Sequence, residues 1–413
     1  MFRRICMLLL ALILAGAPAS AHTRDEVRAA YRALERPGDA SPYETEPVAR
    51  APYAAGALTE RARASALGYL NFIRWLAGVD PVGENAVYDL RCQHGATLLA
   101  ALDYVDHDAP RPADMDADFY ESAHLGTASS NIARLGWTRP TILWDGIEYF
   151  LRDDGEANLS ELGHRRWALN PMMAATGFGL ARSDAGSSYV FLFAHDLGNR
   201  DAAWDRVCWP AAGAFPAELM HADLAWSVTL NPERYDLAAS SPAITLSSAD
   251  GMTFRFLPAT GGGDGYCAIN RESYGPGPCL IFRPDFSGAD FTDYQQNQRW
   301  TVRVDGLADR SGAEVALEYE VEMISLRVED AVAVELSRQE ATLAPGERLA
   351  LTAEVLPAYA DDRSVSWSST DDAVAAVDDR GGVVAVGPGT CRIVARTANG
   401  REDACAVTVA GEP

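Results

Sequence analysis

A histidine followed by two arginines is the strongest chemical signal in this sequence. The run 161–171 places His164 directly before Arg165, Arg166 and Trp167 and ends on an Asn-Pro turn. Near neutral pH a histidine can serve as a metal ligand, a general base or a hydrogen-bond partner. The three large side chains beside it need specific neighbours, so we expect the run to lie inside a folded domain.

Two further segments carry residue types that bind metals. The acidic stretch 153–158 offers the oxygen ligands that calcium prefers, but its spacing does not match an EF-hand loop. A solvated acidic loop is therefore favoured there, with Asn158 capping the turn that presents His164. His22 would become N-terminal after leader removal and could chelate copper, but such a site needs a second histidine on a flat sheet face.

The charge balance excludes several functions. The chain has 58 acidic and 35 basic residues, a net charge of −23, which disfavours a nucleic-acid partner. The sequence contains no lysine, so neither a Schiff-base lysine nor a Ser–Lys dyad can operate. It also lacks the Gly-x-Ser-x-Gly elbow of α/β-hydrolases.

Residues 1–21 are typical of a secretory signal peptide. Arg3 and Arg4 precede a short apolar core over 7–14, and small residues at 19–21 form a cleavage site. The apolar core is too short to span a bilayer, and no later run approaches that length. We therefore expect a secreted, periplasmic or cell-surface protein with no membrane span after leader removal.

The first half of the mature chain predicts helices followed by a strand pair. Residues 22–55 are polar and proline-bearing and are interpreted as a flexible lead-in with a helix near 24–34. Apolar spacing predicts helices over 58–76 and 91–105 and a third beginning near Pro140. Two apolar strands over 176–180 and 189–193 follow, which indicates an α+β fold.

The second half predicts only strands. Short apolar runs between Gly, Pro and Asp over 201–325 are typical of a β-sandwich. Trp209, Trp226 and Trp300 in this region are interpreted as core anchors and not as sugar-binding platforms.

Residues 326–413 resemble a bacterial Ig-like domain of group 2. The resemblance rests on the Trp-Ser-Ser strand over 365–369 and on the stretch from Gly382 to the pair Gly389-Thr390. It implies an extracellular β-sandwich that serves as a spacer or adhesive module.

Residues 56–200 resemble the CAP superfamily, in its bacterial SCP-like extracellular branch. The resemblance is carried by six elements: Leu70–Arg74, His107, Ser130–Ala133, Trp144, Gly163–Arg166 and Gly177–Gly179. It implies an α-β-α sandwich with a surface cleft. The sandwich would be followed by the two all-β domains.

In that family two histidines and two glutamates face each other across the cleft, where they can hold a divalent metal or polarise a ligand. His107 and His164 match the histidines, whereas Ser130 stands where the first glutamate is expected, directly before Asn131. The second glutamate is assigned to Glu148, with Asp145 as the alternative, and a similar Gly-Glu-Asn at 83–85 lies in the wrong place in the order.

The resemblance therefore implies a defined set of site residues. The expected ligand-binding cleft contains the following residues: His107, Ser130, Asn131, Trp144, Glu148, His164 and Arg165. The same set supplies the candidate metal ligands for zinc or calcium, His107 and His164. The candidate catalytic residues are His107, His164, Glu148 and Ser130, the serine only if a histidine lies within hydrogen-bond reach. Loss of one glutamate weakens both metal binding and acid–base catalysis.

Six cysteines remain after leader removal, an even number in an exported chain, which predicts disulfides. The predicted pairs are Cys92–Cys208, Cys267–Cys279 and Cys391–Cys405.

Three functions remain open from the sequence. The first is an exported protein that binds a small ligand or a cell-surface component through the cleft bearing His107 and His164. The second is a metal-assisted or histidine-based extracellular hydrolase of peptidase type. The third is an adhesive or structural surface protein. The missing glutamate favours binding over catalysis.

Overall fold

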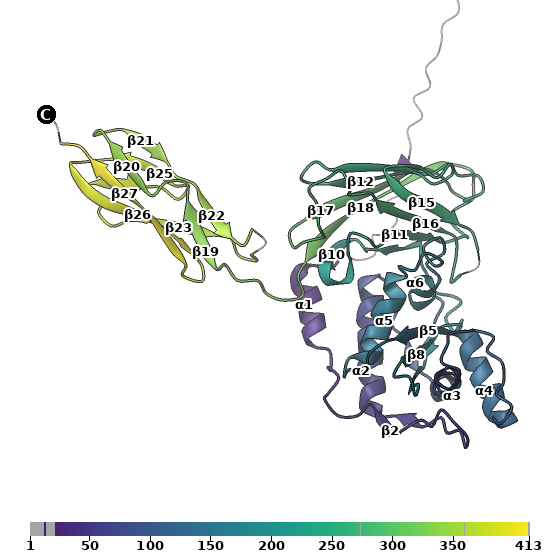
Figure 1. The fold of residues 1–413 in the computed structure, drawn as a ribbon. Helices are drawn as coiled ribbons and strands as arrows, with labels where there is room; N and C mark the ends of the chain where they lie inside the picture. Colours follow the sequence, from purple (N-terminus) through teal and green to yellow (C-terminus); the bar gives the residue numbers. More distant parts are fainter. Residues whose placement is uncertain (1–11, 14–20, 273, 359, 412–413) are drawn as a thin grey trace, which may run out of the picture. The chain divides into compact units, whose positions relative to one another are not determined.

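The computed structural model describes residues 12–13, 21–272, 274–358 and 360–411, which fall into two compact units (Figure 1). Unit 1 extends to Ile324 but leaves out Gln295–Asn297. Unit 2 contains those three residues and everything from Ser325 onward. Unit 1 therefore includes both the helical region and the strand-rich region expected over 201–325.

All the α-helices of the described residues lie in unit 1. They are α1 (Arg24–Arg32), α2 (Glu60–Leu76), α3 (Ala86–Leu102), α4 (Ala117–Ser129), α5 (Ile142–Arg152) and α6 (Gly163–Ala168), with a 3₁₀ turn at Ala217–Leu219. Side chains of Thr23, Thr59, Asn85 and Asp116 accept backbone N–H groups at the starts of α1 to α4, which fixes where these helices begin. The predicted helices correspond to α1, α2, α3 and α5, whereas α4 was not predicted.

A three-stranded antiparallel sheet lies at the centre of the helical region, in the order β5 (Ser130–Leu135), β8 (Ser188–Phe193), β7 (Phe178–Arg182). The pair β7 and β8 is the predicted strand pair. Successive side chains of a strand point to opposite faces. A Cβ on Gly95 of α3 would meet the Phe191 ring, and one on Gly146 of α5 would meet Val190. Helices therefore pack on both faces of this sheet, as Figure 1 also shows.

Short strand pairs complete the helical region. They are β2 (Tyr43–Thr45) with β3 (Ala57–Leu58), and β4 (Gly83–Glu84) with β6 (Ala175–Thr176). Asn85, which follows β4, caps α3, so the Gly-Glu-Asn at 83–85 has a local structural use. Residues 22–55, predicted to be a flexible lead-in, contain α1 and β2, and the Val27 side chain is fully buried.

The remainder of unit 1 consists of two further sheets. The seven-stranded sheet contains β1 (Leu12–Ile13), β10 (Gly213–Pro216), β12 (Ala243–Ser248), β13 (Thr253–Leu257), β14 (Gly262–Gly263), β17 (Arg299–Ala308) and β18 (Glu314–Ile324). The four-stranded sheet contains β9 (Arg206–Trp209), β11 (Trp226–Leu230), β15 (Gly265–Asn270) and β16 (Cys279–Pro284).

Aromatic side chains join these two sheets face to face. The ring centroids of Trp226 on β11 and Trp300 on β17 lie 6.4 Å apart, and those of Phe282 on β16 and Phe256 on β13 lie 5.3 Å apart. Trp209, Trp226 and Trp300 are at most 1% exposed. The expectation that these tryptophans are core anchors is confirmed.

Unit 2 is built only of strands. They are β19 (Ala333–Leu336), β20 (Glu340–Leu343), β21 (Arg348–Ala350), β22 (Ala353–Leu356), β23 (Val365–Ser369), β24 (Ala375–Val377), β25 (Gly382–Ala385), β26 (Gly389–Thr397) and β27 (Glu402–Val409). Its larger sheets have the orders β20-β27-β26-β23 and β21-β25-β24, and they enclose an apolar core of their own that includes Leu351, Ile393 and Val407. The predicted Trp-Ser-Ser strand is β23.

The predicted disulfides are not formed, because all six cysteines of the described residues are free and buried. Cys267 lies opposite Phe282 and Cys279 opposite Asn270 in the β15–β16 ladder, an offset of three residues that turns the two thiols to opposite faces. Cys391 and Cys405 are offset by two positions on β26 and β27. Such diagonal neighbours lie about 7–8 Å apart, beyond the usual reach of a disulfide.

The third predicted pair is separated in the fold. Cys92 lies within α3, where its Sγ is 3.4 Å from the Ser130 Oγ, whereas Cys208 belongs to β9 of the four-stranded sheet. Burial raises the pKa of the Cys92 thiol to about 12, so this cysteine stays protonated and unreactive at neutral pH.

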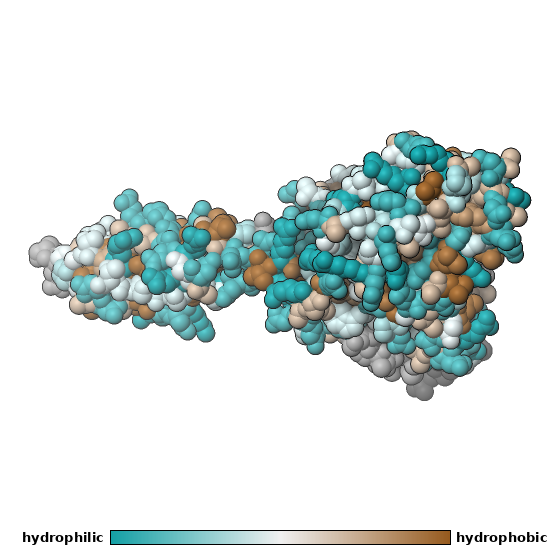
Figure 2. All heavy atoms as spheres, turned by 90° about the horizontal axis from the view of Figure 1, so that it is seen from below, coloured by the Kyte–Doolittle hydropathy of each residue, from teal (hydrophilic) through white to brown (hydrophobic). Residues whose placement is uncertain are grey.

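The surface is largely hydrophilic. Figure 2 shows mostly hydrophilic residues on the visible face of both units, with small scattered apolar patches. Among the described residues, no helix is long and apolar enough to cross a membrane. The predicted signal peptide lies almost entirely outside the described residues.

Candidate functional site

His164 is held by a buried carboxylate. It lies in the first turn of α6, and its Nδ1 is 2.8 Å from Oδ1 of Asp153, whose side chain is fully buried. Asp153 follows α5 directly with a left-handed backbone, so its carboxylate turns back toward α6 and also accepts the Arg165 backbone N–H. The acidic stretch at 153–158 therefore supplies the partner of His164, a role that the sequence analysis did not assign.

Arg165 lies in the interior of unit 1. Arg165 is 1% exposed. Its guanidinium donates to the carbonyl oxygens of Leu151 and Arg152 in the helical region. The same guanidinium donates to the Ala225 carbonyl at 2.7 Å and lies 3.3 Å from the Ser227 Oγ at β11. Arg165, expected in the ligand-binding cleft, thus connects α5 and α6 to the outer face of the four-stranded sheet.

Arg166 makes a parallel connection. Its guanidinium donates to the Glu161 carbonyl, to the Asn270 Oδ1 at 2.7 Å, and to the carbonyls of Glu272 and Gly277. Burial lowers the pKa of both Arg165, to about 10, and Arg166, yet both stay protonated at neutral pH. We call Arg165 and Arg166, with the carbonyl and amide oxygens that they bind, the arginine junction.

Trp167, at the other end of the motif, forms with His195 and His107 a group that we call the histidine cluster. The Trp167 ring lies 4.3 Å from the ring of His195, a residue just after β8 that the sequence analysis did not single out. Burial lowers the pKa of His195, and the charge of His107 adds to this effect. His107 Nδ1 is 2.8 Å from the Thr127 carbonyl. His164 and Trp167 are three residues apart on α6 and so share a helical face.

Ser130 and Asn131, at the start of β5, serve different neighbours. The Ser130 hydroxyl is buried against Cys92, and no hydrogen bond in the described part of the chain joins it to a histidine. The Asn131 side chain donates to the His164 carbonyl at 2.8 Å and so anchors α6 to the central sheet. The nucleophilic pairing of Ser130 with a histidine is therefore not set up.

Trp144 and Glu148 lie one turn apart on α5 and both contact Tyr69 of α2. The Trp144 ring stacks on Tyr69 at 4.2 Å, and the Glu148 Oε1 accepts the Tyr69 hydroxyl at 2.7 Å. Burial raises the pKa of Glu148. The indole N–H of Trp144 is bonded at Ser65, so this buried tryptophan serves mainly in packing.

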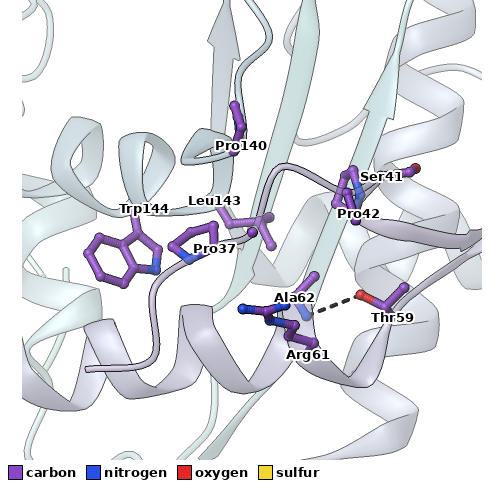
Figure 3. Close-up of a pocket in the computed structure, with 11 residues that line it drawn as sticks. Pro37, Ser41, Pro42, Thr59, Arg61, Ala62, Pro140, Leu143 and Trp144 are labelled. Atoms are coloured by element: carbon purple, nitrogen blue, oxygen red, sulfur yellow. Dashed lines mark hydrogen bonds between the residues drawn. The ribbon is translucent and has the colours of Figure 1, made fainter. Parts of the chain in front are cut away.

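A small apolar pocket of about 150 Å³ opens beside Trp144 (Figure 3). Pro37, Pro140, Leu143 and Arg61 are among its lining residues. Neither His107 nor His164 lines it, so Trp144 and the histidines belong to different surfaces.

A larger cavity of about 390 Å³ also borders α5. Its lining residues are Leu135, Trp137, Arg139, Asp145, Glu148, Tyr149 and Arg152, and we call it the α5 cavity. It contains both residues considered for the second glutamate, Asp145 and Glu148, but neither histidine. The expected cleft set is thus distributed over the histidine cluster, the arginine junction, the start of β5 and two separate pockets that border α5.

The residues present do not fit a metal site. Among the described residues, no group of three or more His, Cys, Asp or Glu side chains is placed to hold an ion. The Nδ1 atoms of His107 and His164 already face Thr127 and Asp153, and no carboxylate joins the two rings. His22, the copper candidate, stacks on Trp75 at 3.6 Å and bonds to its carbonyl.

One part of the chain matches a known family. Residues 330–409 match the sequence profile of the Bacterial Ig-like domain (group 2), which confirms the Ig-like prediction for this segment. The profile covers strands β19 to β27, the whole of the strand-built core of unit 2.

Curated relatives share only short segments with this chain. Lacto-N-biosidase of Bifidobacterium bifidum is 44% identical over 68 residues, 16% of this chain and 6% of that protein. The Minor capsid protein of Enterobacteria phage T3 is 44% identical over 82 residues, 20% of this chain and 18% of that protein. The chain thus spans less than a fifth of the length of either relative.

Solved structures are similarly distant. An intimin mutant of EHEC O157:H7 aligns with 18% of this chain and 45% of its own, at 16% identity and a TM-score of 0.16. The N-terminal part of the bacterial S-layer protein SbsC aligns with 87% of this chain and 81% of its own, at 12% identity and a TM-score of 0.18. These scores define no shared overall fold.

Proposed function

We propose that this chain is an exported surface protein with an adhesive or structural role. The observation that carries the proposal is the Ig-like match over 330–409, in a unit with its own apolar core. The leader-like residues 1–21 agree with a location outside the cytoplasm. In this proposal, residues 56–200 form the main domain, residues 201–325 form a β-sandwich domain, and residues 326–413 form the Ig-like module.

Surface labelling of the producing cells tests this proposal. Antibodies raised against the full chain should label intact cells as strongly as permeabilised cells. A deletion strain should lose the label and show weaker attachment or an altered cell envelope. Label that appears only after permeabilisation would overturn the proposal.

A second role is supported by the helical region. We propose that residues 56–200 are a CAP-type domain that binds a ligand beside the histidine cluster. Support comes from helices on both faces of the central sheet, from the Gly-His-Arg-Arg element, and from Trp167 and His195 in ring contact with His107 nearby. Proton NMR titration of the histidine rings during addition of cell-envelope extracts would test it. Ring signals of His107 and His195 that never shift would contradict the role.

A further inference from the structure

The α5 cavity combines exposed aromatic rings with paired charges. Trp137 is 49% exposed and Tyr149 is 38% exposed, whereas Trp209, Trp226 and Trp300 are buried. The cavity volume of about 390 Å³ falls within the range of roughly 300–1,000 Å³ that small-molecule pockets occupy. An exposed indole at the rim of a cavity is available to a ligand in a way that a core tryptophan is not.

Trp137 is held in place although it faces solvent. Its Nε1 donates to the Asp145 Oδ2 at 3.0 Å, and its backbone carbonyl accepts the Ser188 hydroxyl at 2.9 Å. Arg139 is bonded to the same Asp145 carboxylate and lies 5.9 Å from the Trp137 ring centre. Because Asp145 is 8% exposed and fixed in α5, the ring is preorganised, which lowers the entropic cost of binding.

The polar groups of the cavity leave hydrogen-bonding capacity for a ligand. Glu148 uses Oε1 for Tyr69, and no hydrogen bond to its Oε2 occurs within the described residues. The Arg152 guanidinium likewise makes no hydrogen bond or ion pair there, although its charge acts on Glu148. A carboxylate oxygen and a planar guanidinium that line the same cavity offer an acceptor and several donors to one ligand.

The charges of the residues that line the α5 cavity indicate which class of ligand it binds. Two arginines and two carboxylates give the cavity no net formal charge, in a chain whose net charge is −23. A phosphorylated or otherwise strongly anionic ligand is therefore disfavoured. A neutral molecule with an apolar face and adjacent hydroxyl groups fits instead: the face packs on an aromatic ring, and the hydroxyls bond to carboxylate and guanidinium.

We propose that the α5 cavity binds a neutral saccharide, with Trp137 and Tyr149 as stacking rings and Glu148 and Arg152 as hydrogen-bonding partners of the sugar hydroxyls. All of these residues lie in unit 1, so this site does not depend on the Ig-like module. The proposed saccharide site adds a ligand class to the proposed surface role, which specifies none.

Calorimetric titration of the full chain with cellohexaose, chitohexaose and xylohexaose tests the proposal. At least one of these should bind, and Trp137→Ala should weaken its binding about tenfold or more. Arg152→Met should weaken binding several-fold. Tyr104→Ala, which removes an aromatic ring 41% exposed outside the cavity, should bind as the unchanged chain does.

Trp137→Phe separates the ring from its anchor, because phenylalanine keeps a ring but cannot donate to Asp145. Its affinity should lie between those of the unchanged chain and Trp137→Ala. Equal melting temperatures of the variants would show that the fold is intact. The proposal is overturned if none of the three oligosaccharides binds, or if Trp137→Ala binds as tightly as Tyr104→Ala does. Neither result would affect surface labelling, so the two proposals fail separately.

Discussion

Arginine is used in opposite ways in two regions of unit 1, the arginine junction and the α5 cavity. In the arginine junction, Arg165 and Arg166 are almost fully buried and bind carbonyl and amide oxygens of the strand-rich region. In the α5 cavity, the Arg139 side chain is 57% exposed and the Arg152 guanidinium has no hydrogen-bond partner in the described chain. The conspicuous sequence motif therefore stabilises unit 1, while the cavity suited to a ligand is lined by Asp145 and Glu148 together with residues that had no assigned role in the sequence.

The comparison predicts the largest effect at Arg165. Arg165→Ala would leave the Leu151 and Ala225 carbonyls without a donor in a buried place. We expect the free energy of unfolding of unit 1 to fall by about 3 kcal/mol or more. Urea denaturation followed by circular dichroism measures it.

Arg152→Ala is the matched control for that experiment, since it deletes a guanidinium from the same neighbourhood without breaking a hydrogen bond of the described chain. Its effect should stay within about 0.5 kcal/mol. If Arg165→Ala and Arg152→Ala lower the free energy of unfolding equally, the arginine junction is no more important for stability than the α5 cavity.

A smaller effect is expected for Arg166→Lys, which keeps the positive charge but replaces the planar guanidinium with an ammonium group. Four oxygens surround the planar guanidinium of Arg166, and an ammonium group cannot reach them all. Arg166→Lys should cost about 2 kcal/mol, measured by the same denaturation. Arg152→Lys provides the control and should be neutral. If Arg166→Lys is neutral as well, the junction depends on charge alone and not on its bonding geometry.

How well each region can be predicted depends on how few consecutive residues contain its sequence pattern. The apolar periodicity of α2 and the Trp-Ser-Ser pattern of β23 lie within a few residues of chain, and the bounds of both elements agree closely with the sequence prediction. Helix α4 was missed because it follows a stretch rich in Asp and Pro, which is typical of a loop.

The site depends on contacts that no local pattern contains. His195 meets Trp167 only because β8 ends beside α6, and Asp153 meets His164 only because the chain turns left-handed after α5. The cysteine count suggested disulfides, but strand register decides which thiols face each other. An aspartate at a helix end, eleven residues before a histidine, was the one local clue to the His164 partner.

A third prediction compares the two histidines of the resemblance. Removing the His164 ring would leave the fully buried Asp153 carboxylate with the Arg165 backbone N–H at 3.3 Å. We expect His164→Ala to lower the free energy of unfolding by about 1–2 kcal/mol. His107 is exposed and bonds to one carbonyl, so His107→Ala should cost less than about 1 kcal/mol. Thermal unfolding of both variants measures the difference. A greater loss of stability for His107→Ala than for His164→Ala would contradict the structural role of His164.

The smallest effect concerns the protonation of Glu148. Burial raises the pKa of Glu148 above its ordinary value of 4.5, so the folded chain binds this proton more tightly than the unfolded chain does. The resulting stabilisation is fully present below pH 4.5 and is lost as the pH rises through the raised pKa. Glu148→Gln keeps an oxygen acceptor for Tyr69 but cannot ionise. The stability of this variant relative to the unchanged chain should therefore increase from pH 4 upward and then level off, by less than about 1 kcal/mol in total.

Paired urea titrations at several pH values between 4 and 8 measure this difference and cancel the effects of the other carboxylates. Asp154→Asn serves as the control, because it removes an exposed carboxyl near the end of α5 and leaves Glu148 in place. If the difference for Glu148→Gln instead decreases as the pH rises, the folded chain stabilises the ionised carboxylate. Arg152 would then pair with Glu148, and the hydrogen-bonding capacity that distinguishes the cavity from the arginine junction would already be used within the protein.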